Sequence, residues 1–260
     1  MAAVEYGARG ILGLLVPQAN TTSEPEVNVL LGADLVLLSG RLTSAAPGLR
    51  ERLEHYVQRI DAYLDTFGDA PLDAAGFLIT GSTYPMAHDD EDALFARIGA
   101  ARGYPVVSAG QAIRRALRAL GAKRIGLVSP YPAWLTERSV DYWTRAGMNI
   151  VAVEAPETPG GFHDIYVMRG PAVLAAARRL ADKKPDAVLL TGAGMPTLGP
   201  MIALARAGLV PLSSNFCMAW QIEQRGSTAP DAVAALRRLL EPRAAWHRLF
   251  SERFPSSVCA

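Results

Sequence analysis

The chain has 260 residues, half of them hydrophobic, and a formal net charge of +1 from 26 basic and 25 acidic side chains. A chain of this size and composition can bury a large core as one α/β domain or as two tightly joined halves. The balanced, interspersed charges give no electrostatic footprint for nucleic acid. Apolar runs such as Ile11 to Val16 are too short to span a membrane, and the N-terminus lacks a signal-peptide pattern, so we expect a cytoplasmic protein.

Short apolar segments alternate with stretches of helical periodicity, which is typical of parallel strands covered by helices. The sequence predicts strands at Gly10 to Val16, Ala75 to Thr80, Pro105 to Ser108, Arg124 to Ser129, Asn149 to Glu154, Ala187 to Thr191 and Val210 to Ser213. It predicts helices at Ala46 to Phe67, Glu91 to Arg102, Ala109 to Leu120, Ala133 to Ala146, Pro171 to Ala181, Thr197 to Ala207, Asn215 to Gln224 and, in the tail, Ala229 to Arg253.

The same arrangement occurs twice along the chain. A strand opens each unit, at Ile11 to Val16 and at Ile125 to Ser129, and a later strand ends in a glycine-containing turn. Because parallel sheets bind ligands beyond the carboxyl ends of their strands, both turns should border one cleft. The Pro- and Gly-rich stretch Ala155 to Gly161 is expected to be a mobile loop over that cleft.

The turn Gly81-Ser82-Thr83-Tyr84 directly follows a buried strand. Its backbone N–H groups and two hydroxyls suit a carboxylate or an enediolate oxygen, although one hydroxyl could instead cap a helix. The second turn, Thr191 to Pro196, also exposes backbone donors. It lacks the Lys of a P-loop and the spacing of a dinucleotide site, so nucleotide binding is not expected.

Other polar side chains also follow strands. Asn20 offers a carboxamide that could bind a carboxylate or cap a helix, and Tyr131 offers a phenolic hydrogen bond or a packing surface. His163 beside Asp164 is the preferred proton-transfer pair, with a solvated loop histidine as the alternative. Cys217 is placed in the first turn of a helix, where the pKa of a thiol can be depressed, or else is a buried apolar group.

The only cysteines are Cys217 and Cys259, and they show no CxxC or Cys/His spacing. Neither a disulfide framework nor a structural zinc site is supported, and we expect no metal or other cofactor.

These segments together resemble the maleate isomerase and arylmalonate decarboxylase branch of the Asp/Glu racemase superfamily, over about residues 9 to 225. The resemblance implies an α/β fold of two pseudosymmetric Rossmann-like halves with parallel sheets and the active site between them. The first half would comprise 1–118 with 215–260, and the second 119–214, in one compact body. The matching segments are Val16 to Glu24, Gly81 to Thr83, Ser129 to Tyr131 with Thr136 to Arg138, Leu190 to Leu198, and Ser213 to Asn215 with Trp220.

In that family racemases and maleate isomerases carry a catalytic thiol in each of the two turns, whereas arylmalonate decarboxylases keep the second thiol and have Gly at the first position. This chain has Gly81 and Gly192 at the corresponding positions. The resemblance therefore implies a carboxylate pocket without its nucleophiles. The implied substrate-binding residues are Asn20, Gly81, Ser82, Thr83, Tyr131, Gly192, Ala193, Gly194 and Asn215.

The leading hypothesis is a cofactor-independent lyase or isomerase that stabilises an enolate or enediolate of a small carboxylate. Its acid or base would be, in descending order of preference, His163, Asp164, Tyr84 or Cys217. One alternative is a hydrolase or hydratase that holds a water in the vacated thiol positions. Another is a non-catalytic dicarboxylate-binding protein. The sequence leaves open whether the chain forms a homo-oligomer.

Overall fold

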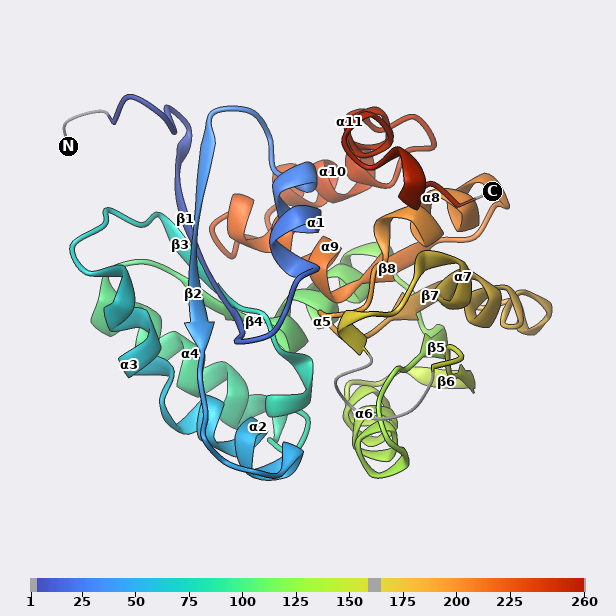
Figure 1. Cartoon of the computed structure of the whole chain (residues 1–260), viewed down its shortest axis with the longest axis horizontal. Helices are drawn as coiled ribbons and strands as arrows, with labels where there is room; N and C mark the ends of the chain where they lie inside the picture. Colours follow the sequence, from blue (N-terminus) through green and yellow to red (C-terminus); the bar gives the residue numbers. More distant parts are fainter. Residues whose placement is uncertain (1–3, 159–164, 260) are drawn as a thin grey trace.

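The computed structural model describes residues 4–158 and 165–259. Within them the chain forms two four-stranded parallel sheets, with strand orders β2-β1-β3-β4 and β6-β5-β7-β8 (Figure 1). This confirms the predicted α/β fold with paired parallel sheets. The strands of the first sheet are β1 (Gly10–Pro17), β2 (Leu35–Leu42), β3 (Ala74–Phe77) and β4 (Val106–Ser108), and those of the second are β5 (Arg124–Val128), β6 (Asn149–Glu154), β7 (Ala187–Leu190) and β8 (Pro211–Ser213).

The two sheets have the same topology, because β5 to β8 occupy the positions that β1 to β4 occupy in the first sheet. In each sheet the strand order reverses beside the opening strand, at β1 and at β5. Ligands of open parallel sheets bind beyond the carboxyl ends of the strands at such a reversal. The strands there are continuous apolar runs: every residue of β3 and of β7 is buried, as expected for strands covered on both faces.

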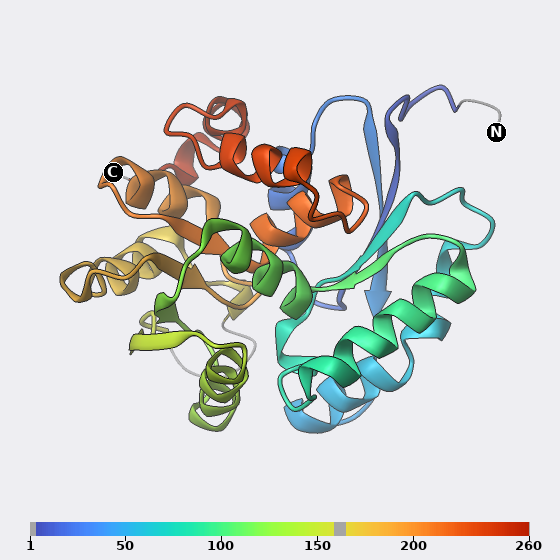
Figure 2. The ribbon, with the colours of Figure 1, turned by 180° about the vertical axis from the view of Figure 1, so that it is seen from behind.

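Helices cover both sheets. Those of the N-terminal part are α1 (Ser23–Leu30), α2 (Leu49–Gln58), α3 (Ile60–Leu64), α4 (His88–Arg102) and α5 (Ala109–Leu120). Those that follow are α6 (Ala133–Arg145), α7 (Gly170–Arg178), α8 (Leu198–Arg206), α9 (Ser214–Glu223), α10 (Pro230–Leu239) and α11 (Ala245–Arg253). Although α9 follows the second sheet in sequence, it packs against α1, α5, β3 and β4, and Figure 2 shows α5, α9 and α10 side by side. No helix in the described part of the chain is long and apolar enough to cross a membrane.

The structure corrects the sequence prediction in four places. Strand β2 and helix α1 were not predicted; β2 is an edge strand whose apolar run is interrupted by Ser39 and Gly40. The helix predicted for Ala46 to Phe67 breaks at Arg59, where the backbone leaves helical geometry (φ −115°, ψ 20°). The tail forms two helices, α10 and α11, separated at Pro242, because proline lacks the N–H that a continuing helix needs.

Candidate functional site

The turns that follow β1, β3, β5 and β7 meet at a small cavity between the two halves, with a volume of about 20 Å³. Pro17 follows β1, Gly81 follows β3, Tyr131 follows β5, and Ala193 and Gly194 follow β7. Four of the predicted site residues therefore line one cavity, as expected if both glycine-containing turns border a single site.

The remaining walls of this cavity are apolar, and the sequence analysis did not identify them. Tyr131 and Tyr166 are the only titratable side chains among the described lining residues. A leucine on a helix gives no sequence signal that separates a cavity wall from the ordinary core, but an aromatic residue in a loop, such as Tyr166, could have been flagged. The additional lining residues are Leu53, Ile79, Leu135, Ile165 and Tyr166.

Tyr166 lines both this cavity and a second one of about 20 Å³, and the two cavities also share Pro17, Leu53 and Ile79. The Tyr166 ring also lies against Gly194, where an added Cβ would meet its Cε1 atom at 2.6 Å. Burial raises the pKa of the Tyr166 phenol to about 12, so it is neutral at physiological pH. Each cavity has room for about one water. Admission of a substrate therefore requires displacement of a wall, and Tyr166 is a wall common to both cavities.

Tyr131 presents a neutral phenol to the cavity. Its hydroxyl lies 2.8 Å from Oγ1 of Thr80, and burial raises the pKa of the phenol well above its usual value. Tyr84, a predicted acid or base, is fully buried, and burial raises its pKa as well. Its ring packs edge-on against Tyr131, with centroids 6.4 Å apart, and it does not line the cavity. Of these two packed tyrosines, Tyr131 therefore lines the cavity and Tyr84 does not.

Ser82 and Thr83 follow Gly81 in a single 3₁₀ turn, Thr80–Ser82. The Ser82 hydroxyl is buried and makes no hydrogen bond with any described residue, whereas Thr83 Oγ1 donates to the Thr80 carbonyl at 3.4 Å. Neither hydroxyl caps a helix, so the helix-capping role that the sequence left open for this turn is wrong. Ser82 follows the cavity-lining Gly81 but does not itself line the cavity, and its unpaired hydroxyl can donate to a ligand without breaking an internal bond.

Asn20 and Asn215 are buried and bonded within the protein. Asn20 Oδ1 accepts from the backbone N–H of Thr22 and Ser23, and its Nδ2 donates to Ser23 Oγ at 2.9 Å. Asn215 Nδ2 donates to the Ala193 carbonyl at 3.2 Å, and Ser23 Oγ lies 3.0 Å from that same carbonyl. These side chains hold the turn Thr191 to Pro196 in place. Direct substrate binding by either asparagine remains a prediction.

Glu26 lies at the centre of the same group of buried side chains. One carboxylate oxygen accepts from the backbone N–H of Thr197 and Leu198 at 2.5 and 3.0 Å, and the other accepts from Thr197 Oγ1 and Asn215 Nδ2. Burial raises the pKa of this carboxyl, while the hydrogen bonds oppose the increase. Helix α1 of the first half is thereby joined to the start of α8 in the second. Thr197 Oγ1 also lies 2.9 Å from Ser213 Oγ. We call Asn20, Ser23, Glu26, Thr197, Ser213 and Asn215 the polar cluster.

The two glycines at the predicted thiol positions differ in the space around them. A Cβ on Gly81 would lie 3.3 to 3.4 Å from the side chains of Leu53 and Leu135. Gly192 has φ +97°, in the left-handed region that favours glycine, and an added Cβ would meet Pro130 Cγ at 2.7 Å. The structure therefore accommodates a side chain at position 192 only with backbone strain.

Cys217 is the one remaining acid–base candidate that the structure describes. Cys217 is fully buried within α9, and burial raises the pKa of its thiol, contrary to the depressed pKa that its place near a helix start suggested. Cys217 does not line the cavity. His163 and Asp164 lie outside the described residues, so their proton-transfer role stays a prediction. Among the described residues, no group of three or more His, Cys, Asp or Glu side chains could hold a metal ion.

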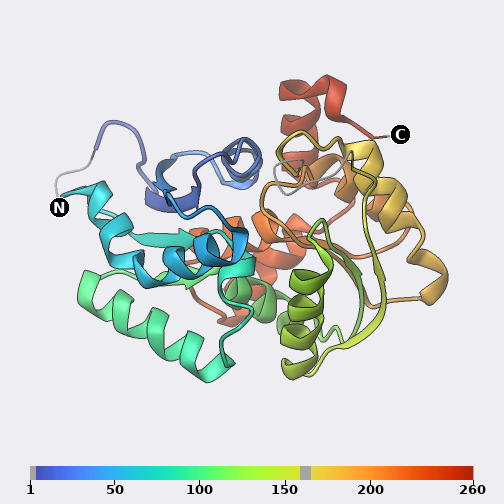
Figure 3. The same ribbon diagram turned by 60° about the horizontal axis from the view of Figure 1, so that its bottom comes forward.

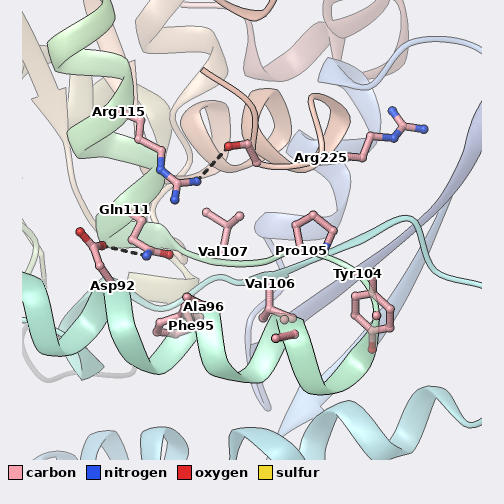
Figure 4. A pocket seen from close by; sticks show the side chains of 14 residues that line it. Asp92, Phe95, Ala96, Tyr104, Pro105, Val106, Val107, Gln111, Arg115 and Arg225 are labelled. Atoms are coloured by element: carbon pink, nitrogen blue, oxygen red, sulfur yellow. Dashed lines mark hydrogen bonds between the residues drawn. The ribbon is translucent and has the colours of Figure 1, made fainter. Parts of the chain in front are cut away.

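A larger open hollow of about 640 Å³ lies along β4, between α4 and α5 (Figure 4). Its charged side chains are already bonded: Arg115 donates to Gln221 Oε1 at 2.7 Å, and Asp92 accepts from Arg114 and Gln111. It lies along the edge strand β4 and not at the reversal of strand order between β1 and β3, so the small cavity is the candidate site.

The fold and the cavity define a two-sheet α/β protein with its candidate site between pseudosymmetric halves. Comparison with known proteins identifies the family. The arylmalonate decarboxylase family model matches residues 12–239, and the chain belongs to this family. The predicted resemblance to the maleate isomerase and arylmalonate decarboxylase branch of the Asp/Glu racemase superfamily is confirmed, and the relationship supports an isomerase- or lyase-like enzyme.

Individual relatives agree with this placement. The chain is 30% identical to the maleate isomerase of Nocardia farcinica over 88% of its own length and 94% of that protein. It is 27% identical to the Geobacillus stearothermophilus maleate isomerase, but this match covers 56% of the chain and 64% of that relative. A solved structure of the Nocardia farcinica maleate cis-trans isomerase, a variant with a covalently bound succinylcysteine intermediate, superposes with a TM-score of 0.71 at 27% identity, covering 83% of this chain and 92% of that one.

Proposed function

We propose that this chain is a cofactor-independent enzyme that decarboxylates a malonate bearing an apolar substituent, without a catalytic thiol. The observation that carries the proposal is the cavity itself. Its walls are apolar except for backbone groups and the phenols of Tyr131 and Tyr166, and the turn beside it contains the unpaired Ser82 hydroxyl.

The apolar walls favour loss of a charged group. A carboxylate held against Leu53, Leu135 and Ile165 is poorly solvated, and it escapes this cost when it leaves as neutral CO₂. The bond between Cα and that carboxylate breaks, its electron pair forms the enediolate of the remaining carboxylate, and Cα then takes up one proton. In this proposal the enediolate oxygens accept hydrogen bonds from Tyr131 and from the Gly81–Thr83 turn. One pre-organised donor of this kind lowers a barrier by about 3 kcal/mol.

The proposal separates this chain from the maleate isomerase relatives. The Nocardia farcinica structure contains a covalent succinylcysteine, so a cysteine bonds the substrate in that protein. Here neither Cys217 nor Cys259 lines the cavity, and both thiols have pKa values raised by burial. We therefore expect no cis/trans isomerisation of maleate.

The test is a substrate screen with aryl- and alkylmalonates, maleate, hydantoins and amides, followed by proton NMR in deuterated water. Decarboxylation gives a monocarboxylate with one deuteron at Cα, whereas isomerisation and hydrolysis give other products. The native reaction should survive iodoacetamide and the substitution Cys217→Ser. Loss of activity in that variant, with circular dichroism unchanged, would show that a thiol is used after all.

The variant Tyr131→Phe tests whether the Tyr131 hydroxyl donates a hydrogen bond to the enediolate. Removing one such hydrogen-bond donor should lower kcat by about 100- to 1,000-fold, because the donor stabilises the enediolate and not the bound substrate. Tyr104→Phe, at the remote hollow beside β4, is the matched control and should retain full kcat. Equal kcat in the two variants would exclude Tyr131 as the donor. Variants His163→Gln and Asp164→Asn, assayed in parallel, test the proton-transfer prediction.

A further inference from the structure

A second hollow, of about 300 Å³, is bordered by Glu26 of the polar cluster. Its volume is within the range of small-molecule sites, which begins at about 300 Å³. Four segments distant in sequence form it: the start of α1, the residues leading into α7, the start of α8, and the C-terminal part from α11 onward. Figure 3 shows α7 and α11 at the same end of the molecule.

The walls of this hollow combine apolar surface with one unpaired positive charge. Met168, Phe250, Phe254 and four prolines, at 25, 171, 196 and 200, supply the apolar part. Arg169 is exposed at the wall, and its guanidinium makes no hydrogen bond or ion pair with any described residue. Helix α7 begins beside it at Gly170, and no side chain caps that helix. In the first turn of α7, Pro171 has no N–H and the N–H of Ala172 donates to the Arg169 carbonyl, so the free guanidinium is the main attraction for an anion.

The other charged residue of the wall does not oppose an anion strongly. Both oxygens of Glu26 are bonded to Thr197, Leu198 and Asn215, so they point into the polar cluster. The hydroxyls of Thr21, Thr22, Ser256 and Ser257 complete the polar part of the wall. The chemistry that fits is one anionic group attached to a small apolar body.

We propose that this hollow is a second binding site, for a small amphipathic monocarboxylate such as an aromatic acetic acid. Its carboxylate contacts Arg169 and the start of α7, and its ring lies against Met168, Phe250 and Phe254. The proposal does not depend on the reaction proposed above.

The site adjoins the candidate active site through two threonines. Thr22 Oγ1 donates to the Gly194 carbonyl at 2.8 Å, and Thr21 Oγ1 donates to the Tyr166 carbonyl at 3.4 Å. Gly194 and Tyr166 both line the small cavity. A ligand in the hollow therefore contacts residues that hold the wall of the cavity in place.

The experiment uses the full chain with ¹³C-methyl methionine, because the Met168 methyl group reports on the hollow specifically. Its NMR signal is the one that disappears in Met168→Leu. Titration with phenylacetate should shift this signal saturably, while phenylacetamide, which lacks the charge, and acetate, which lacks the ring, should bind at least about tenfold more weakly.

Arg169→Gln should raise the Kd of phenylacetate at Met168 by about tenfold or more, as expected for loss of a hydrogen bond to a charged group. Arg97→Gln, an exposed arginine on α4 far from the hollow, is the matched control and should leave the Kd unchanged. The proposal is overturned if the Met168 signal does not respond, if phenylacetamide shifts it with the same Kd, or if Arg169→Gln binds as the wild type does.

Discussion

Ser82 is a residue whose contribution to binding can be separated from its contribution to stability. Its buried hydroxyl has no partner among the described residues, so its removal breaks no internal hydrogen bond. Ser82→Ala should weaken calorimetric binding of malonate by about 1 to 3 kcal/mol while leaving the free energy of unfolding unchanged.

Ser23→Ala is the contrasting control, because Ser23 Oγ bonds Ala193 and Asn215 and its loss should destabilise the fold. The same calorimetry on Ser82→Ala with Thr83→Ala tests the pair predicted from the sequence. Unaltered malonate affinity in a folded Ser82→Ala variant would remove this turn from the binding site.

Gly192 and Gly81 should respond differently to the same small substitution. At φ +97°, Gly192→Ala places a Cβ in the left-handed region and against Pro130, so urea unfolding should show a loss of at least about 1 to 2 kcal/mol. Gly81→Ala meets only the mobile ends of two leucine side chains and should change stability much less. If both variants unfold at the same urea concentration, the second turn is less constrained than its geometry indicates.

At the scale of elements, α1 is joined to the start of α8 by the buried carboxyl of Glu26. Its pKa is raised in the folded chain, so the folded state holds this proton more tightly than the unfolded state does. The stabilisation linked to this proton is therefore fully present below the unfolded value near 4.5 and is lost as the pH rises through the folded pKa.

Glu26→Gln should abolish this dependence. Urea unfolding of the wild type and the variant from pH 7 down toward 4.5 should show a wild-type stability that rises relative to the variant as the pH falls. Glu54→Gln, an exposed glutamate of α2, serves as the control and should follow the wild type. If the free energies of unfolding of the wild type and of Glu26→Gln depend on pH in the same way, the raised pKa of Glu26 is contradicted.

At the scale of the whole molecule, a second buried charge cluster joins helices that cover different sheets. Glu91 of α4 is fully buried and accepts from Tyr142 of α6 at 2.5 Å and from Arg114 of α5 at 3.2 Å. Helix α4 packs on β4 of the first sheet and α6 on β6 of the second. The cluster therefore ties the two halves together without lining the small cavity.

Arg114→Met should reduce the free energy of unfolding by about 3 to 5 kcal/mol, because it leaves the Glu91 carboxylate buried without its cation. Arg179→Met removes an exposed ion pair with Glu154 and should cost less than about 1 kcal/mol. The double variant Glu91→Leu with Arg114→Met should recover part of the loss. An Arg114→Met variant as stable as Arg179→Met would show that the cluster does not secure the halves.

The sequence determined the α/β class, the paired parallel sheets and the turns after β3, β5 and β7 that line the candidate site, because these depend on local patterns of apolar strands and glycine-containing turns. It did not reveal β2 or α1, since an edge strand and a short helix have weak periodicity. Only the tertiary structure decided that Leu53, Leu135 and Tyr166 form the cavity walls, that Ser82 is unpaired, and that Cys217 is sealed within α9. The physical reason is that burial and hydrogen-bond partners are set by segments far apart in the chain, and a local pattern carries no information about which distant segment will cover it.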